Sequence, residues 1–103
     1  MNSNILILFS RKGCCLCESL EKKLSNINLS NLNPPLLLSI VDIDSKEVSN
    51  DIQGKFTNDV PVLVLDSDKL SKKFQLPRVS PRLKGDLLLS WVQKNLDILF
   101  KSS

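Results

Sequence analysis

The hydrophobic residues of the chain form short uninterrupted runs that alternate with stretches of helical spacing. The run from Ile5 to Phe9 has no polar interruption, which is typical of a strand buried on both faces of a mostly parallel sheet. The runs from Leu36 to Val41 and from Val62 to Leu65 predict a second and a third strand. A turn over Asp66 to Lys69 and the stretch Leu70 to Leu76 then predict a short fourth strand that forms a hairpin with the third.

Helical spacing predicts three helices between these runs and after them. The first extends from about Cys15 to Ser25, and its buried stripe is expected at Leu16, Leu20, Leu24 and Ile27. A short second helix begins at a capping pair, Asp44 and Glu47, and ends near Gly54. The third runs from Lys84 or Gly85 to Phe100, and its apolar face is formed by Leu88, Val92, Leu96 and Leu99, with Leu87 and Trp91 beside them.

The predicted order is therefore strand, helix, strand, helix, strand, strand, helix. This order is typical of an α/β fold with a four-stranded mixed sheet flanked by helices, in which parallel crossovers come first and a hairpin adds an antiparallel edge. The stretch Asn26 to Pro35 is rich in Asn, Ser and Pro and predicts a loop. A chain of 103 residues without a linker or an internal repeat is expected to form one domain, residues 1–103.

The most evident chemistry lies between the first strand and the first helix, where Cys14 and Cys17 form a Cys-X-X-Cys pair. Unpaired N–H groups and the positive end of the helix dipole meet at this point and favour a thiolate. Arg11 and Lys12 add positive charge nearby. We therefore expect Cys14 to be the nucleophile and Cys17 the thiol that resolves the mixed disulfide. Such a pair after the first strand indicates a thioredoxin-like redox site.

Other interpretations of these residues stay open. Cys14 and Cys17 would otherwise be small hydrophobic residues in the first turn of a helix. Cys15 is a neutral filler, a site of glutathionylation or a competitor for the wrong disulfide. Arg11 and Lys12 fit solvated loop charges as well as contacts to a ligand.

Composition argues against several classes of function. A net charge of +3, four Phe, one Trp and no Tyr give neither the basic patch nor the stacking platforms of a nucleic-acid-binding protein. No apolar stretch approaches the roughly 20 residues of a membrane span, and we expect no secretory signal and no membrane contact. The three cysteines all lie within Cys14 to Cys17, which favours a reducing compartment over a disulfide framework. We expect a monomer in the cytoplasm.

Metal binding is expected to be absent within one chain. Tetrahedral zinc needs four ligands, and this sequence has three cysteines and no histidine. An iron–sulfur cluster shared between two protomers through Cys14 stays open, because such clusters bind cysteine thiolates. The alternative function is therefore a non-catalytic module that binds an iron–sulfur cluster or a thiol, and a third is an interaction domain whose cysteines do little.

Two motifs carry a resemblance to a known family. The segment Ser10-Arg11-Lys12-Gly13-Cys14 before a helix, together with Val60-Pro61 before the third strand, resembles the glutaredoxin branch of the thioredoxin fold. The Cys-X-Leu-Cys-Glu form at positions 14–18 is similar to that of small glutaredoxin-like proteins, and the resemblance covers nearly the whole chain. It implies a thiol–disulfide oxidoreductase that acts on a disulfide-containing protein or on glutathione as co-substrate, with no tightly bound cofactor.

The resemblance also implies roles for individual residues. Pro61 is implied to be cis and to pack against the active site, which leaves the backbone of Val60 to bind a peptide or glutathione. Arg11 matches in position the basic residue that helps to hold a glutathione carboxylate. Cys15 and Leu16 stand where glutaredoxins usually have proline and an aromatic residue, and their Gly-Gly-X-X-Asp segment is not recognisable here.

Overall fold

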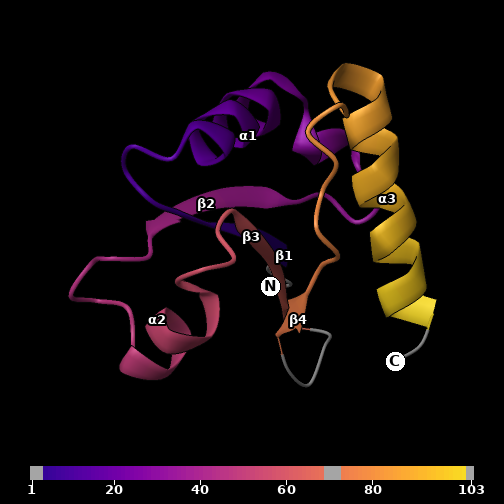
Figure 1. Ribbon diagram of the computed structural model, residues 1–103. Helices are drawn as coiled ribbons and strands as arrows, with labels where there is room; N and C mark the ends of the chain where they lie inside the picture. The colour runs from indigo at the N-terminus through magenta and orange to yellow at the C-terminus, as the bar shows by residue number, and fades with distance from the viewer. Residues whose placement is uncertain (1–3, 69–72, 102–103) are drawn as a thin grey trace.

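The structure, a computed structural model that describes residues 4–68 and 73–101, is built on one mixed sheet with the strand order β2-β1-β3-β4. Its strands are β1 (Asn4–Ser10), β2 (Leu37–Asp42), β3 (Val62–Ser67) and β4 (Phe74–Gln75). Its α-helices are α1 (Cys15–Asn26), α2 (Asn50–Phe56) and α3 (Gly85–Lys101), and a short 3-10 helix, η1, spans Leu29–Asn31. The predicted α/β fold with a four-stranded mixed sheet is confirmed (Figure 1).

The direction of β3 departs from the predicted pair of parallel crossovers. β1 and β2 are parallel, with Ser10 opposite Asp42, whereas β1 and β3 are antiparallel, with Phe9 opposite Val62. The end of β2 and the beginning of β3 therefore lie at the same edge of the sheet. The segment between them, which contains the seven-residue helix α2, does not travel back along the sheet, so β3 runs in the opposite direction.

The central strand β1 is packed on both sides, as its uninterrupted hydrophobic run predicts. Leu6 and Leu8 belong to a core cluster with residues of α1 and α3, whereas Phe9 belongs to a second cluster with residues of α2. The rings of Phe9 and Phe56 have their centroids 5.5 Å apart. Helices α1 and α3 thus cover one face of the sheet and α2 covers the other (Figure 1).

The buried stripe of α1 is shifted by one position at its beginning. Leu16 is 48% exposed, and Cys17 is buried with 1% of its surface exposed, in line with Leu20 and Leu24. Positions 17, 20 and 24 share one helix face, so the prediction that Leu16 is buried was wrong. Ile27 follows the helix as its C-cap and is partly buried against the same core.

Helix α2 begins later than its predicted capping pair. Its N-cap is Ser49, whose Oγ accepts a hydrogen bond from the N–H of Ile52 at 3.3 Å. Asp44 lies in the turn after β2, where its carboxylate pairs with Arg11 instead of capping a helix. Because the carboxylate of Asp44 binds a residue distant in the sequence, it does not cap a helix, and the local sequence pattern does not reveal this distant partner.

Two loops are also more structured than expected. The stretch 26–35 contains η1, where Leu29 and Leu32 are buried in the core. Strand β3 continues through Asp66 and Ser67, where a turn was predicted. Of the predicted fourth strand, the paired residues are Phe74 and Gln75, and residues 69–72 lie outside the described part of the chain. No helix in the described residues is long and apolar enough to cross a membrane.

Neighbouring leucines of α3 offer a matched test of the packing. Leu88 is 0% exposed and Leu87 is 67% exposed. We expect Leu88→Ala to lower the free energy of unfolding by about 2 to 5 kcal/mol because it leaves a cavity in the core. Leu87→Ala, with the same change in helix propensity, is expected to lower it by less than about 0.5 kcal/mol. Urea denaturation of both variants measures the difference, and equal losses would contradict the orientation of α3.

Candidate thiol site

The loop between β1 and α1 places Cys14 at the N-cap of the helix. Gly13 has a φ of 82°, a left-handed conformation that glycine adopts without steric cost, and it turns the chain into α1. The backbone N–H of Cys14 donates to the carbonyl of Arg11 at 3.2 Å, and the carbonyl of Cys14 accepts from the N–H of Glu18 at 3.0 Å. The Sγ of Cys14 accepts a hydrogen bond from the N–H of Cys17 at 3.2 Å. The sulfur thus occupies the place of a capping oxygen.

Hydrogen bonding and burial separate the two thiols in acidity. The pKa of Cys14 is lowered, first by a hydrogen bond from the thiol of Cys17 and also by the N–H groups of Cys17 and Leu16, although burial opposes this effect. The pKa of Cys17 is raised to about 11, chiefly because the side chain is buried and secondly because its thiol donates to Cys14. Cys14 is therefore the thiol that ionises first, and Cys17 holds its proton.

Accessibility follows the same order. All three cysteines are free thiols, of which Cys14 is half-buried, Cys15 is exposed and Cys17 is buried. A disulfide that arrives from outside can reach Cys14 and Cys15, whereas Cys17 is shielded by the core beneath α1.

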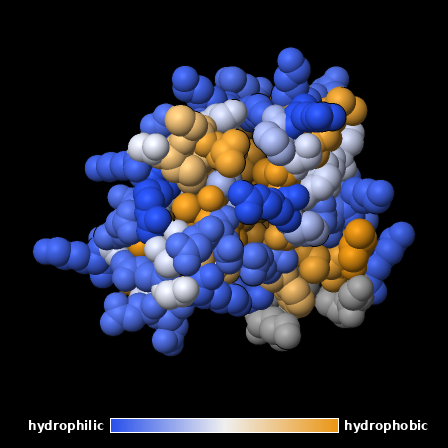
Figure 2. Space-filling model, in the orientation of Figure 1, coloured by the Kyte–Doolittle hydropathy of each residue, from blue (hydrophilic) through white to orange (hydrophobic). Residues whose placement is uncertain are grey.

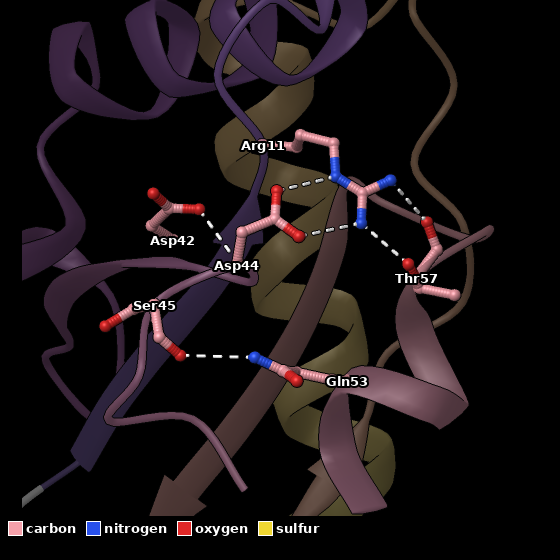
Figure 3. Close-up of polar contacts among 6 residues, drawn as sticks. All are labelled: Arg11, Asp42, Asp44, Ser45, Gln53 and Thr57. Atoms are coloured by element: carbon pink, nitrogen blue, oxygen red, sulfur yellow. Dashed lines mark hydrogen bonds and ion pairs between the residues drawn. The ribbon is translucent and has the colours of Figure 1, made fainter. Parts of the chain in front are cut away.

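The structure places Arg11 in a network of hydrogen bonds with Asp44 and Thr57 (Figure 3). Its Nε and Nη2 donate to the two carboxylate oxygens of Asp44 at 2.9 and 3.1 Å. Its Nη1 donates to the carbonyl of Thr57 at 2.9 Å, and Nη2 also donates to the hydroxyl of Thr57 at 2.6 Å. The guanidinium of Arg11 is therefore already hydrogen-bonded within the protein, to Asp44 and to Thr57.

Pro61 lines a cavity of about 130 Å³ together with Leu16 from α1 and Val79 from the segment before α3. The Val60–Pro61 peptide bond is cis. The N–H of Val60 donates to the carbonyl of Phe56 at 3.2 Å, so a bound chain would have to use the carbonyl of Val60. Figure 2 shows hydrophobic side chains gathered between α1 and this segment on an otherwise largely hydrophilic face.

The described residues contain no group of three or more His, Cys, Asp or Glu side chains that could hold a metal ion. The structure brings Cys14 and Cys17 together, Arg11 lies in the loop that carries Cys14, and Pro61 shares a cavity with Leu16 of α1.

Asp44 and Thr57 are site residues that the sequence interpretation missed. A signal for Asp44 was present, because the carboxyl ends of parallel strands meet at one edge of a sheet and Arg11 and Asp44 each follow such an end. Thr57 had no comparable signal, since its position depends on where α2 ends.

Comparison with known proteins agrees with this fold. The family model of a glutaredoxin-like domain (DUF836) matches residues 5–93, and the chain belongs to this glutaredoxin-like family. Its fold is accordingly the thioredoxin-like fold of glutaredoxins. A solved structure described as "Structure of a malarial protein" aligns with a TM-score of 0.58 and 22% identity, over 91% of this chain and 98% of that one, and supports the fold alone. No curated protein matches the chain.

The separation of the two thiols predicts their reactivity toward iodoacetamide in a Cys15→Ser background. Alkylation requires the thiolate, so Cys14 is expected to react at a lower pH than an ordinary thiol does, because its pKa is lowered. Cys17 is expected to react only as the pH approaches about 11. Mass spectrometry of the alkylated peptides follows both thiols. Adding Cys17→Ala removes the side-chain donor to Cys14, and the alkylation profile of Cys14 is then expected to move to higher pH. Coincident profiles for the two cysteines would contradict this assignment.

Proposed function

We propose that this glutaredoxin-like protein is a thiol–disulfide oxidoreductase in which Cys14 is the nucleophile and Cys17 the resolving thiol. The observation that carries the proposal is the position of Cys14 Sγ at the N-cap of α1, within 3.2 Å of the N–H of Cys17. Thiolate is the attacking species in disulfide exchange, and this position stabilises it without a histidine base.

The first step forms a mixed disulfide. The thiolate of Cys14 attacks one sulfur of the substrate disulfide, a new S–S bond forms, and the other substrate sulfur leaves as a thiolate that takes up a proton. In the second step, the sulfur of Cys17 loses its proton and attacks Cys14. The remaining substrate sulfur then leaves and is protonated. The substrate gains two electrons and two protons, and the protein is left with a Cys14–Cys17 disulfide.

The order of the two steps follows from the interaction of the two thiols. Before the first step, Cys14 raises the pKa of Cys17 both by accepting its hydrogen bond and by its charge. Formation of the mixed disulfide removes the negative charge from Cys14, so Cys17 gives up its proton more easily at the moment when its thiolate is needed. Premature reaction of Cys17 with solvent oxidants is limited by its burial.

The exposed face of the site supports a choice of substrate. The cavity lined by Pro61 and by Leu16, which stands between Cys15 and Cys17 in the sequence, offers a surface for the chain that carries the substrate disulfide. We propose a disulfide-containing protein or glutathione as the partner, without a tightly bound cofactor. The cycle requires a compartment in which thiols are kept reduced, and we place it in the cytoplasm.

A redox titration in glutathione buffers tests the proposed function. We expect a reversible disulfide between Cys14 and Cys17 at a potential within about −120 to −270 mV, the range of working oxidoreductases. Alkylation and mass spectrometry locate the oxidised cysteines. Cys14→Ser is expected to abolish disulfide reduction, whereas Cys17→Ser is expected to stop after the first step, with the substrate thiol bound to Cys14.

The same titration includes outcomes that oppose the proposal. If Cys14 and Cys17 stay reduced, or if oxidation goes mainly to Cys15, the dithiol mechanism fails. Absorbance near 400 nm in the purified protein would instead favour the alternative of an iron–sulfur module, because such clusters are bound by cysteine thiolates.

A further inference from the structure

The contacts of Arg11 suggest a role other than that of a ligand-binding cation. We infer that Arg11 is a positioning residue that fixes the thiol loop against the Val60–Pro61 segment, so that Cys17 can resolve the mixed disulfide on Cys14. This inference rests on the proposed function and deepens it. It assigns Arg11 to the resolving step instead of to binding of glutathione.

Arg11 joins segments that are far apart in the sequence. Its guanidinium uses four N–H groups, two on the carboxylate of Asp44 in the turn after β2 and two on the carbonyl and hydroxyl of Thr57 after α2. These partners lie 33 and 46 positions further along the chain. The loop that contains Arg11 is thereby tied both to the turn after β2 and to the end of α2 (Figure 3).

The partners of Arg11 are themselves held in place. The side chain of Gln53 in α2 donates to the carbonyl of Ser45 at 3.2 Å, which ties the turn after β2 to α2 (Figure 3). The N–H of Ile43 donates to the carbonyl of Ser10 at 2.8 Å, which ties the same turn to the end of β1. The two segments that Arg11 contacts, the turn after β2 and the end of α2, are therefore also held to each other and to β1.

Further hydrogen bonds connect Thr57 to the segment that contains Pro61. Thr57 is the C-cap of α2, and its N–H donates to the carbonyl of Gln53 at 2.9 Å. The carbonyl of Phe56 accepts from the N–H of Val60 at 3.2 Å, so the chain from Thr57 to Pro61 is a tight turn. On the other side, the carbonyl of Arg11 accepts from the N–H of Cys14 at 3.2 Å. Arg11 thus lies three positions before Cys14, and its partner Thr57 lies four positions before the cis proline Pro61.

This network requires an arginine. The planar guanidinium presents its N–H groups in a fixed fork that matches a carboxylate edge and still leaves donors for a second partner, whereas lysine presents a single ammonium group. The ion pair is open to solvent, since the side chains of Arg11 and Asp44 are 34% and 57% exposed. Exposed pairs contribute little to overall stability, so the effect expected from this network is one of position.

The same residue acts electrostatically on the resolving thiol. The positive charge of Arg11 and a hydrogen bond from its backbone both lower the pKa of Cys17, against the larger effect of burial. When the mixed disulfide has formed, Arg11 is still in place to favour the thiolate of Cys17. Both the geometry and the charge of Arg11 therefore act on the second step.

A role in binding a glutathione carboxylate makes a different demand on Arg11. A ligand carboxylate would have to displace Asp44, which already holds the guanidinium through two oxygens. If Arg11 served the ligand, removal of the charge of Asp44 would free it and improve binding. If Arg11 serves position, the same change would impair the second step.

Single-turnover kinetics with oxidised glutathione separate these possibilities. In a Cys15→Ser background, acid quenching and mass spectrometry follow the mixed disulfide on Cys14 and its conversion to the Cys14–Cys17 disulfide, with release of one glutathione at each step. We expect Arg11→Lys to slow the second step by about tenfold or more, because small misplacements of reacting groups have effects of this size or larger. Asp44→Asn is also expected to slow the second step. The rate of the first step is expected to change less than about threefold in both variants.

Lys12→Met is the matched control. It removes a positive charge from the neighbouring position of the same loop and leaves the four hydrogen bonds of Arg11 in place. We expect its second step to stay within about twofold of the starting protein. Circular dichroism at the assay temperature shows that each variant is folded, so that a slow second step reports position and not unfolding.

The outcomes are distinct. A second step at the starting rate in Arg11→Lys overturns the inference. A loss confined to the first step in Arg11→Lys, relieved by higher concentrations of oxidised glutathione and absent in Asp44→Asn, also overturns it and assigns Arg11 to the ligand. If the starting protein itself never forms the Cys14–Cys17 disulfide, the proposed function fails, and this result is seen without any change at Arg11 or Asp44.

Discussion

The first turn of α1 has N–H groups without partners in the helix, and one of them is satisfied by the sulfur of Cys14. This single contact links the fold to the chemistry of the site. It fixes the sulfur at the positive end of the helix and brings it to the thiol of Cys17 one turn further on. The difference in acidity between the two cysteines arises from this arrangement, together with the burial of Cys17.

The central position of β1 in the sheet brings the loops of the site together. Because β1 pairs with β2 on one side and with β3 on the other, its end lies between the turn at Asp44 and the beginning of β3 next to Pro61. Phe9 of β1 and Phe56 of α2 pack in one core cluster, with their ring centroids 5.5 Å apart. The apolar contact between Phe9 and Phe56 and the hydrogen bonds between Arg11 and Thr57 therefore join the same two regions, the end of β1 and the end of α2.

Much of the fold could be predicted from the sequence because its information is local. Uninterrupted hydrophobic runs identified β1, β2 and β3, and helical spacing identified α1 and α3. The beginning of α2 was missed because the carboxylate of Asp44, a good capping group by its local context, binds Arg11 instead. The direction of β3 was missed because hydrophobic patterns indicate that a strand is buried but not which way it runs.

The site shows the same limit. The pair Cys14 and Cys17 is evident from spacing alone, whereas the exchange of Leu16 for Cys17 on the buried face depends on how α1 rotates against the sheet. The contact of Arg11 with Thr57 joins residues 46 positions apart and depends on the length of α2. Such contacts follow from the assembled structure and have no signature in a single sequence.

The burial of Cys17 has a practical consequence for finding partners. Under the proposed mechanism, a partner protein forms its mixed disulfide with the half-buried Cys14, and the thiol of the protein that resolves this bond is Cys17, at 1% exposure. Without that inner sulfur, a captured protein would remain covalently attached under conditions in which ordinary complexes dissociate. A variant without the Cys17 thiol would therefore allow the attached partner proteins to be isolated and identified.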